Sequence, residues 1–178
     1  MRGSTVARNY AEALFELGEL SGSTDRYAAM IDAVAGAVET TPEVQGVLMS
    51  PRVPKAEKAR LLGSAFKGAP REFVLFLQAL VKRGRQRLLR EIATEYEGLL
   101  DIKHNRVRAG VTLARPADPA LQQEIQAALS RQLGKEVIAA FHVDPEVLGG
   151  TVVRVGERIH DGSVRRRMTK LRRSLLSH

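Results

Sequence analysis

Cationic side chains crowd the end of the chain, where they could bind an anionic partner. Residues 163–178 contain no acidic residue, and their cations are Arg165, Arg166, Arg167, Lys170, Arg172 and Arg173. The first three lie in the first turn of a predicted helix, where the positive end of the helix dipole disfavours each cation by roughly 0.3–1 kcal/mol. We therefore interpret the cluster as facing an anionic partner, and a merely solvated helix face is the alternative.

The helix that carries these cations is predicted from its apolar spacing. Ser163 suits the N-cap position, and one apolar stripe follows from Val164, Met168, Leu171 and Leu175. Upstream, Gly149 and Gly150 follow a turn, and residues 151–155 then alternate polar and apolar side chains like a strand. The Gly-Glu pair at 156–157 predicts a tight hairpin into a second strand at 158–160. The turn between that strand and the helix consists of Asp161, Gly162 and Ser163.

The chain lacks the patterns typical of nucleotide, metal or acid–base sites. It contains neither G-x-x-x-x-G-K-[ST] nor G-x-G-x-x-G, and the glycine pair leads into a strand rather than a helix. The four histidines show no metal-ligand spacing, and the absence of cysteine excludes thiolate sites and disulfides. The carboxylates of Asp144, Glu146 and Asp161 stand beside turn residues, which accounts for them without catalysis. We expect no catalytic residue, no cofactor and no bound metal.

The composition is that of a folded, soluble protein. Of the 178 residues, 44% are hydrophobic and 27% are charged, and no apolar run approaches the ~20 residues needed to span a bilayer. The N-terminus shows no signal or transit segment, which predicts a bacterial cytoplasmic protein that meets a membrane only through partners. Residues 1–105 carry 15 Lys and Arg against 13 Asp and Glu, whereas residues 106–178 carry 13 against 7. The basic character therefore belongs to the C-terminal part.

Two domains of different class are predicted. Residues 1–105 show helical periodicity only, with helices expected at 5–20, 24–40, 43–49, 55–67, 71–83 and 86–103. The polar stretch 101–106 ends this six-helix bundle. For residues 106–178 the pattern predicts strands at 106–113, 137–143, 151–155 and 158–160. It also predicts one helix that begins at 116–119, and the terminal helix. The order β-α-β-β-β-α predicts a small mixed sheet flanked by two helices, so the fold class is α+β.

Two predicted helices carry more apolar surface than a small bundle needs. In the first, Val6, Tyr10, Ala13, Leu14 and Leu17 form one stripe, which Ala7, Ala11 and Phe15 widen to roughly half the circumference. In the fifth, Gln78 is the only polar residue between positions 73 and 81. This surplus indicates a groove for another chain, and complete internal packing is the alternative.

Motifs at both ends of the chain resemble one family. The opening TVARNYAEALFELG resembles the first helix of the delta subunit of F-type ATP synthases, which is homologous to the mitochondrial oligomycin-sensitivity-conferring protein. The C-terminal order is also similar: an apolar-Gly-Gly turn at 148–150, a strand ending at Gly156, the turn at 159–165 and a basic terminal helix. Two motifs at the right separation are far more specific than either alone, and the resemblance covers essentially the whole chain.

The resemblance implies a connector rather than an enzyme. In that family the first and fifth helices receive an N-terminal helix of the alpha subunit, and the matching positions here are Tyr10, Ala13, Leu14, Phe76, Ala79 and Leu80. The C-terminal domain grips the ends of the b subunits, for which we expect Arg166, Arg167 and Arg173. The structural signature consists of Gly149, Gly150, Asp161, Gly162 and Ser163. The chain would then lie at the cytoplasmic face of the bacterial plasma membrane, coupling rotary proton transport to ATP synthesis.

A basic protein that binds RNA or the ribosome is the alternative function. The sequence pI of about 10.3 and the arginine-rich helix favour it. Aromatic residues make up only 4% of the chain and none lies among the terminal cations, so bases would lack their usual stacking partners. Binding that falls steeply with salt would distinguish RNA recognition from a connector that is indifferent to RNA.

Overall fold

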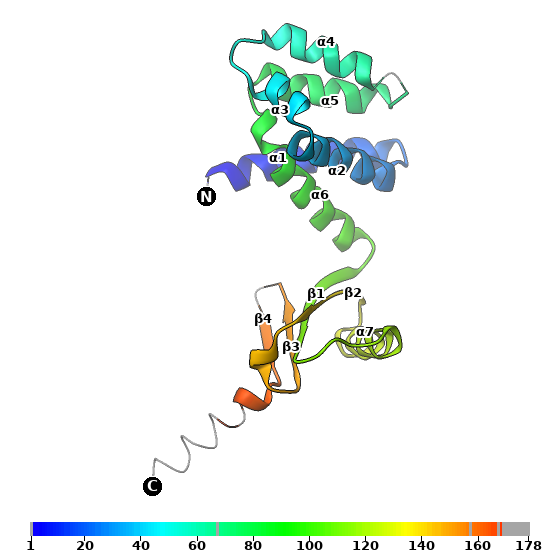
Figure 1. The fold of residues 1–178 in the computed structure, drawn as a ribbon. Coiled ribbons are helices and arrows are strands. Elements are labelled where there is room, and N and C mark those ends of the chain that lie inside the picture. The colour runs from blue at the N-terminus through cyan, green and yellow to red at the C-terminus, as the bar shows by residue number, and fades with distance from the viewer. Residues whose placement is uncertain (1, 67, 157, 167, 169–178) are drawn as a thin grey trace. The chain divides into compact units, whose positions relative to one another are not determined.

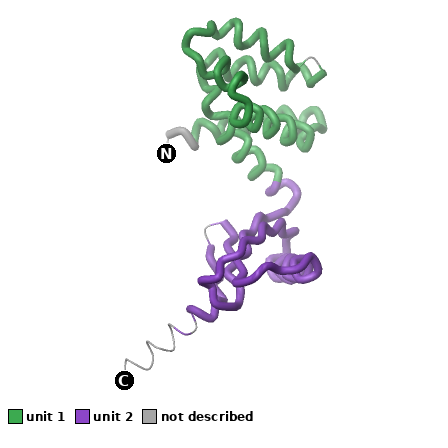
Figure 2. Tube along the Cα trace, viewed as in Figure 1, with its two compact units in different colours: residues 1–100 green, residues 101–178 purple. Residues whose placement is uncertain are grey.

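A computed structural model describes residues 2–66, 68–156, 158–166 and 168 of the chain. It divides into two compact units, Met1–Leu100 and Asp101–His178 (Figure 2). The first is helical and the second is built on a four-stranded sheet, so the α+β fold class is confirmed. The boundary predicted between residues 105 and 106 lies a few residues beyond this division and remains a prediction.

The described residues of unit 1 form six α-helices at nearly the predicted positions, the last of which continues past Leu100 (Figure 1). They are α1 (Arg2–Leu20), α2 (Thr24–Thr40), α3 (Pro42–Met49), α4 (Lys55–Ala65), α5 (Arg71–Lys82) and α6 (Leu89–Lys103). The last of these was expected to begin at residue 86, but Gln86–Leu88 form a short 3₁₀ helix, η1. Such tight turns are frequent at α-helix ends, and apolar spacing alone does not distinguish them from α-helix.

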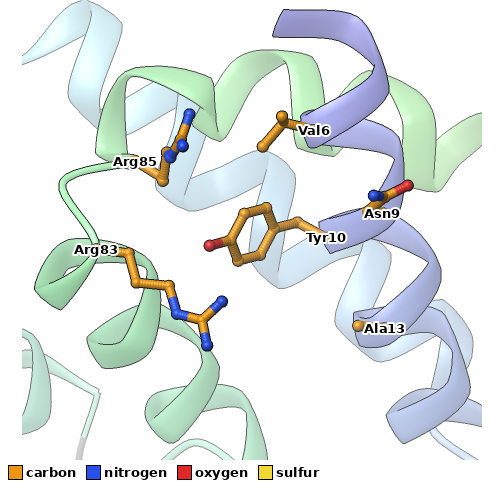
Figure 3. Close-up of a pocket in the computed structure, with 6 residues that line it drawn as sticks. All are labelled: Val6, Asn9, Tyr10, Ala13, Arg83 and Arg85. Atoms are coloured by element: carbon orange, nitrogen blue, oxygen red, sulfur yellow. The ribbon is translucent and has the colours of Figure 1, made fainter. Parts of the chain in front are cut away.

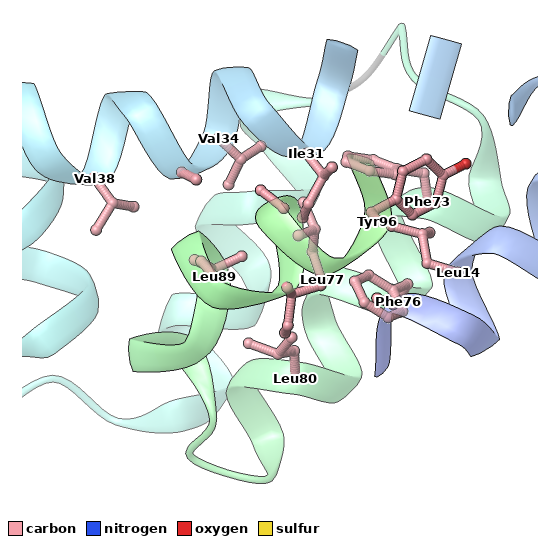
Figure 4. Packing of buried hydrophobic residues seen from close by; sticks show 14 of the residues in the cluster. Leu14, Ile31, Val34, Val38, Phe73, Phe76, Leu77, Leu80, Leu89 and Tyr96 are labelled. Atoms are coloured by element: carbon pink, nitrogen blue, oxygen red, sulfur yellow. The ribbon is translucent and has the colours of Figure 1, made fainter. Parts of the chain in front are cut away.

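One hydrophobic core joins the helices of unit 1 (Figure 4). The side chains of Leu14, Ile31, Phe73 and Tyr96 are fully buried, and they come from α1, α2, α5 and α6. The Tyr96 hydroxyl donates a hydrogen bond of 2.9 Å to the Thr24 carbonyl oxygen, so this polar group does not remain unpaired in the core. Burial, with a smaller contribution from the negative charge of Asp25, raises the pKa of Tyr96, so the phenol stays protonated.

Polar contacts also fasten α6 to α2 at the surface. The Arg90 guanidinium lies 2.7 Å from the Asp32 carboxylate and 2.6 Å from the Glu39 carboxylate. Hydrogen bonds to Glu39 and then Asp32 raise the pKa of Arg90, and the same contact lowers the pKa of Glu39. These exposed ion pairs align the two helices but contribute little stability compared with the apolar core.

Unit 2 contains a mixed sheet with strand order β2-β1-β3-β4. The strands are β1 (Arg106–Leu113), β2 (Glu136–Val143), β3 (Thr151–Val155) and β4 (Arg158–Asp161). β1 pairs parallel with β2 and antiparallel with β3, and β3 pairs antiparallel with β4 as the predicted hairpin. The parallel pair requires a crossover, which α7 (Pro119–Leu133) provides.

The ends of α7 follow directly from its sequence. The Asp118 carboxylate accepts a 2.7 Å hydrogen bond from the Leu121 amide, which makes Asp118 the N-cap. Gly134 ends the helix in the left-handed conformation at φ 64°. The remaining connection, from β2 to β3, contains the short 3₁₀ helix η2 (Pro145–Val147).

The two faces of the sheet differ in burial. On the α7 side the register brings together Ala109, Val111, Val153 and Val155. Val111 is fully buried and Ala109 is almost fully buried. The opposite side carries the alternate residues, including Gly110, Ile138, Arg154 and Ile159. Ile138 and Ile159 are among the exposed large hydrophobic side chains, with Ile159 55% exposed. One face therefore forms the core of unit 2, and the other remains available.

Candidate partner-binding surfaces

A groove lies between α1 and the connection that follows α5 (Figure 3). It has a volume of about 610 Å³ and is lined by Val6, Asn9, Tyr10, Ala13, Arg83 and Arg85. The α1 residues recur at i, i+3, i+4 and i+7, which places them along one side of the helix. The groove is thus an elongated surface, mostly apolar along α1 and cationic on the opposite side.

Tyr10 is the largest side chain in this groove, and its ring packs against a residue of the hydrophobic core. Its ring packs edge-on against Phe76 of α5, with centroids 6.2 Å apart and an interplanar angle of 74°. Phe76 itself is 8% exposed, so the contact anchors α1 to α5 and leaves part of Tyr10 at the surface. Ala13, one turn further along α1, is exposed and small enough for a partner helix to approach closely.

The six groove residues expected from the sequence lie in three environments. Tyr10 and Ala13 line the groove, and Ala79 is exposed on α5 but is not part of that lining. The other three, Leu14, Phe76 and Leu80, belong to the core, and Leu14 and Leu80 have no exposed surface. They can therefore support the groove rather than present a surface to a partner. Their assignment to a partner contact remains a prediction.

Three residues that line the groove were not expected from the sequence: Asn9, Arg83 and Arg85. Val6 was expected only as part of the apolar stripe of the first helix, and it also lines the groove. A signal for the two arginines was present, because residues 82–90 hold five cations and residues 73–90 contain no acid. Their place opposite α1 depends on the fold, since more than sixty residues separate Tyr10 from Arg83. Periodicity within one helix cannot reveal such a pairing.

In unit 2, the glycine pair marks a close approach of two backbone segments. Gly150 has φ +81°, and a Cβ there would lie 2.5 Å from the Gly162 carbonyl oxygen. The Gly162 amide donates to the Thr151 carbonyl at 3.0 Å, and the Val164 amide donates to the Gly149 carbonyl at 2.9 Å. Gly149, Gly150 and Gly162 thus serve the same junction, where β3 begins and the terminal helix starts.

Asp161 and Ser163 direct the chain out of β4. An Asp161 carboxylate oxygen accepts from the Ser163 amide at 2.9 Å, and the Ser163 hydroxyl accepts from the Arg166 amide at 3.2 Å. Hydrogen bonds from Ser163, and to a lesser extent the charge of Arg166, lower the pKa of Asp161. These contacts form the predicted turn and N-cap, so the geometry assigns these residues a structural role.

The described part of the terminal helix presents one of the three expected arginines. Arg166 is exposed and borders a shallow hollow of about 600 Å³ beside β3 and β4, together with Ile159 and His160. Its neighbour Arg165 pairs instead with Glu146 at 3.0 Å. Arg167 and Arg173 lie outside the described residues, as does the rest of the predicted helix after residue 168.

The open face of the sheet offers a second surface on unit 2. The residues that line a hollow of about 320 Å³ on this face include Gly110, Ala140, Arg108, Arg154 and Ile138. Arg108 is already engaged by Asp101, with 2.7 Å between Nε and the carboxylate. The surface combines exposed apolar and cationic groups, which suits a protein partner.

The described residues do not form a site for metal chemistry or a membrane span. None of their His, Asp and Glu side chains gather in groups of three or more that could hold a metal ion. Within the same residues, no helix has the length and apolar character needed to cross a bilayer.

Comparison with known proteins identifies the family. The family model described as ATP synthase delta (OSCP) subunit matches residues 6–175, which spans both units. The chain belongs to this family. Among curated relatives, the ATP synthase subunit delta of Gemmatimonas aurantiaca is 42% identical over 176 residues, covering 98% of this chain and 95% of that protein. The subunit delta of Desulforamulus reducens is 36% identical, covering 99% and 98%.

One solved structure has a similar fold. It is a chain of the cryo-EM structure of the Toxoplasma gondii mitochondrial ATP synthase hexamer, with a TM-score of 0.69 and 20% identity. The match covers 96% of this delta-family chain and 97% of that one. At this identity the likeness concerns the fold, which is shared along nearly the whole length.

Proposed function

We propose that this chain, a structural subunit of the ATP synthase peripheral stalk, holds the catalytic head through unit 1 and the b subunits through unit 2. The family match across residues 6–175 carries this proposal. Within the complex the subunit has no catalytic role. Its work is mechanical, because the head must be tethered against the drag of the rotating central stalk for rotation to drive ATP synthesis.

The contact with the head uses the groove of unit 1. An amphipathic N-terminal helix of the alpha subunit would place its apolar face along α1, over Tyr10 and Ala13. Tyr10 offers contact area and a hydroxyl, and Ala13 permits close approach. Leu14, Phe76 and Leu80 support these two from the core, and Ala79 extends the exposed surface of α5.

The contact with the b subunits uses the basic end of unit 2. Arg166 is exposed there, and Arg167 and Arg173 follow it in the sequence. Binding through both units places the chain at the periphery of the membrane complex, on the cytoplasmic face of a bacterial plasma membrane. The membrane is reached through partners, and no cofactor or small-molecule substrate takes part. No finding favours the RNA-binding alternative.

The groove contact is tested by charge substitution. Tyr10→Asp or Ala13→Glu should weaken binding of the N-terminal peptide of the cognate alpha subunit about 100-fold or more, because a charge buried in such a contact costs several kcal/mol. Calorimetry measures the affinity, and far-UV circular dichroism checks that the helices persist. Ala33→Glu, at an exposed alanine of α2, is the matched control and should leave the affinity unchanged. Unchanged affinity in the Tyr10 and Ala13 variants would refute the groove assignment.

A further inference from the structure

We infer that Arg83 and Arg85 make one side of the groove an anion-recognition element, which selects a partner helix with acidic side chains beside its apolar face. This inference deepens the proposed alpha-subunit contact and rests on it. Arg83 and Arg85 would then determine specificity, and the docked helix must supply carboxylates.

The geometry places both guanidinium groups where a docked helix would pass. Figure 3 shows the Tyr10 ring projecting from α1 toward the connection that carries Arg83 and Arg85, with its hydroxyl on that side. Both arginines are exposed, and all six residues that line the groove are apolar, neutral polar or cationic. A helix lying along α1 would therefore meet apolar groups on one side and two cations on the other.

Charge around the groove reinforces this polarity. Arg90, further along the chain, is taken up by Asp32 and Glu39, but among the described residues Arg83 and Arg85 form no ion pair. Lys55 adds a further cation, since its ammonium group donates to the Lys82 carbonyl at 3.1 Å, next to Gly84. Like charges held together without a local counter-ion favour an incoming anion.

Stability of α5 explains only part of this cluster. Arg83 caps the C-terminus of α5, where a cation complements the negative end of the helix dipole. Arg85 lies beyond the helix, after the left-handed Gly84 at φ +70°, and has no such role. The turn at Gly84 brings Arg85 to the groove beside Arg83. Two guanidinium groups on one side suit carboxylates, which they bind with two parallel hydrogen bonds.

The experiment uses the full-length chain and two synthetic peptides. One is the N-terminal segment of the cognate alpha subunit, and the other has each Asp and Glu replaced by Asn and Gln. The chain variants are Arg83→Gln with Arg85→Gln, the charge-conserving Arg83→Lys with Arg85→Lys, and Arg52→Gln with Arg71→Gln as a control. The control removes two exposed cations of unit 1 that do not line the groove. Calorimetry at low and high salt measures each affinity.

We expect the Gln pair to weaken binding of the native peptide about tenfold at low salt, and less at high salt, because exposed charge contacts are screened. The amide peptide should bind the unchanged chain as weakly as the native peptide binds the Gln pair. Its affinity for the Gln pair should be no lower, since both changes remove the same interaction. The Lys pair should retain the salt dependence, and the control should match the unchanged chain. Equal melting temperatures show that the fold persists.

Other outcomes overturn the inference. If the Gln pair binds the native peptide normally while Tyr10→Asp does not, the acidic requirement is wrong and the groove contact stands. If neither change affects binding, the groove contact itself is wrong, and the inference falls with it. Losses that add independently between peptide and chain would show that the carboxylates meet some other group. A dimer of the chain alone that Tyr10→Asp abolishes would assign the groove to a second copy.

Discussion

At the residue scale, Gly150 illustrates how one missing side chain shapes unit 2. Its φ of +81° is a conformation that L side chains rarely adopt, and the Gly162 carbonyl oxygen occupies the place of a Cβ. Both constraints act where β3, β4 and the start of the terminal helix meet. Any side chain at this position must therefore displace backbone, which is anchored by the hydrogen bond between Gly162 and Thr151.

We predict that Gly150→Ala destabilises unit 2 by at least about 2–3 kcal/mol, from backbone strain together with the close contact. Gly134→Ala is the matched control, because Gly134 has φ +64° but no atom within 4 Å of the place where a Cβ would stand, so only the strain of roughly 1–2 kcal/mol remains. Amide hydrogen exchange in β1 and β3 of the full-length chain measures both effects. Equal exchange in the two variants would contradict the close-contact argument.

Sequence reasoning succeeds at residues whose role is local. The Asp161 turn and the Ser163 N-cap follow from side chains that bond to backbone two or three residues away, and both are confirmed. Arg83 and Arg85 could not be placed in the same way, because the groove exists only once α1 and the end of α5 come together. The clash that requires Gly150 likewise depends on Gly162, from another strand end.

At the element scale, α1 and α5 show how an apolar surplus divides between core and surface. Ala7, Ala11 and Leu14 of α1 are completely buried, and so is most of the apolar surface of α5. What remains outside is the Tyr10 and Ala13 side of α1 and a stripe of α5 that includes Leu75, which is 51% exposed. The spacing of apolar residues indicates how wide the apolar arc of each helix is. It does not indicate which side of that arc packs against neighbouring helices, because that depends on tertiary packing.

The terminal helix supplies the prediction at this scale. Replacing Arg166, Arg167 and Arg173 together with Gln should leave the melting temperature unchanged or slightly higher, because it relieves crowding of like charges and the unfavourable dipole interaction. Retention on an immobilised b-subunit fragment should fall, most at low salt, since exposed charge contacts are screened. Thermal melts and retention at low and high salt are measured for the same samples.

Arg165→Gln is the control for this experiment, because Arg165 already pairs with Glu146 and should contribute little to the stalk. Loss of folding in the triple variant would make the arginines structural. Full retention at low salt would instead direct attention to the open face of the sheet, with Ile138 and Arg154.

At the scale of the whole molecule, two units with separate cores are joined by a continuous element. α6 begins in unit 1 and ends at Lys103, beyond the division after Leu100. Its last turn is tied to β1 by Asp101, whose carboxylate lies 2.7 Å from Arg108 Nε and 3.3 Å from an Arg106 nitrogen. The polar break here was predicted from the sequence. The restraint by one buried carboxylate was not, because nothing in the spacing of Asp101 indicates which cations it meets in the fold.

We predict that limited trypsin digestion separates the units after Lys103, since residues 102–105 are exposed and Asn105 turns the chain at φ +51°. Asp101→Asn should accelerate this cut roughly tenfold, because losing a charge-assisted pair makes local opening easier. Glu91→Gln, an exposed change on the same helix, should not alter the rate. Mass spectrometry of the time course identifies the cut.

The released N-terminal fragment should melt cooperatively by circular dichroism, because its core is complete within residues 7–96. A fragment without helical structure would show that unit 1 depends on unit 2 and that the division into two domains is wrong.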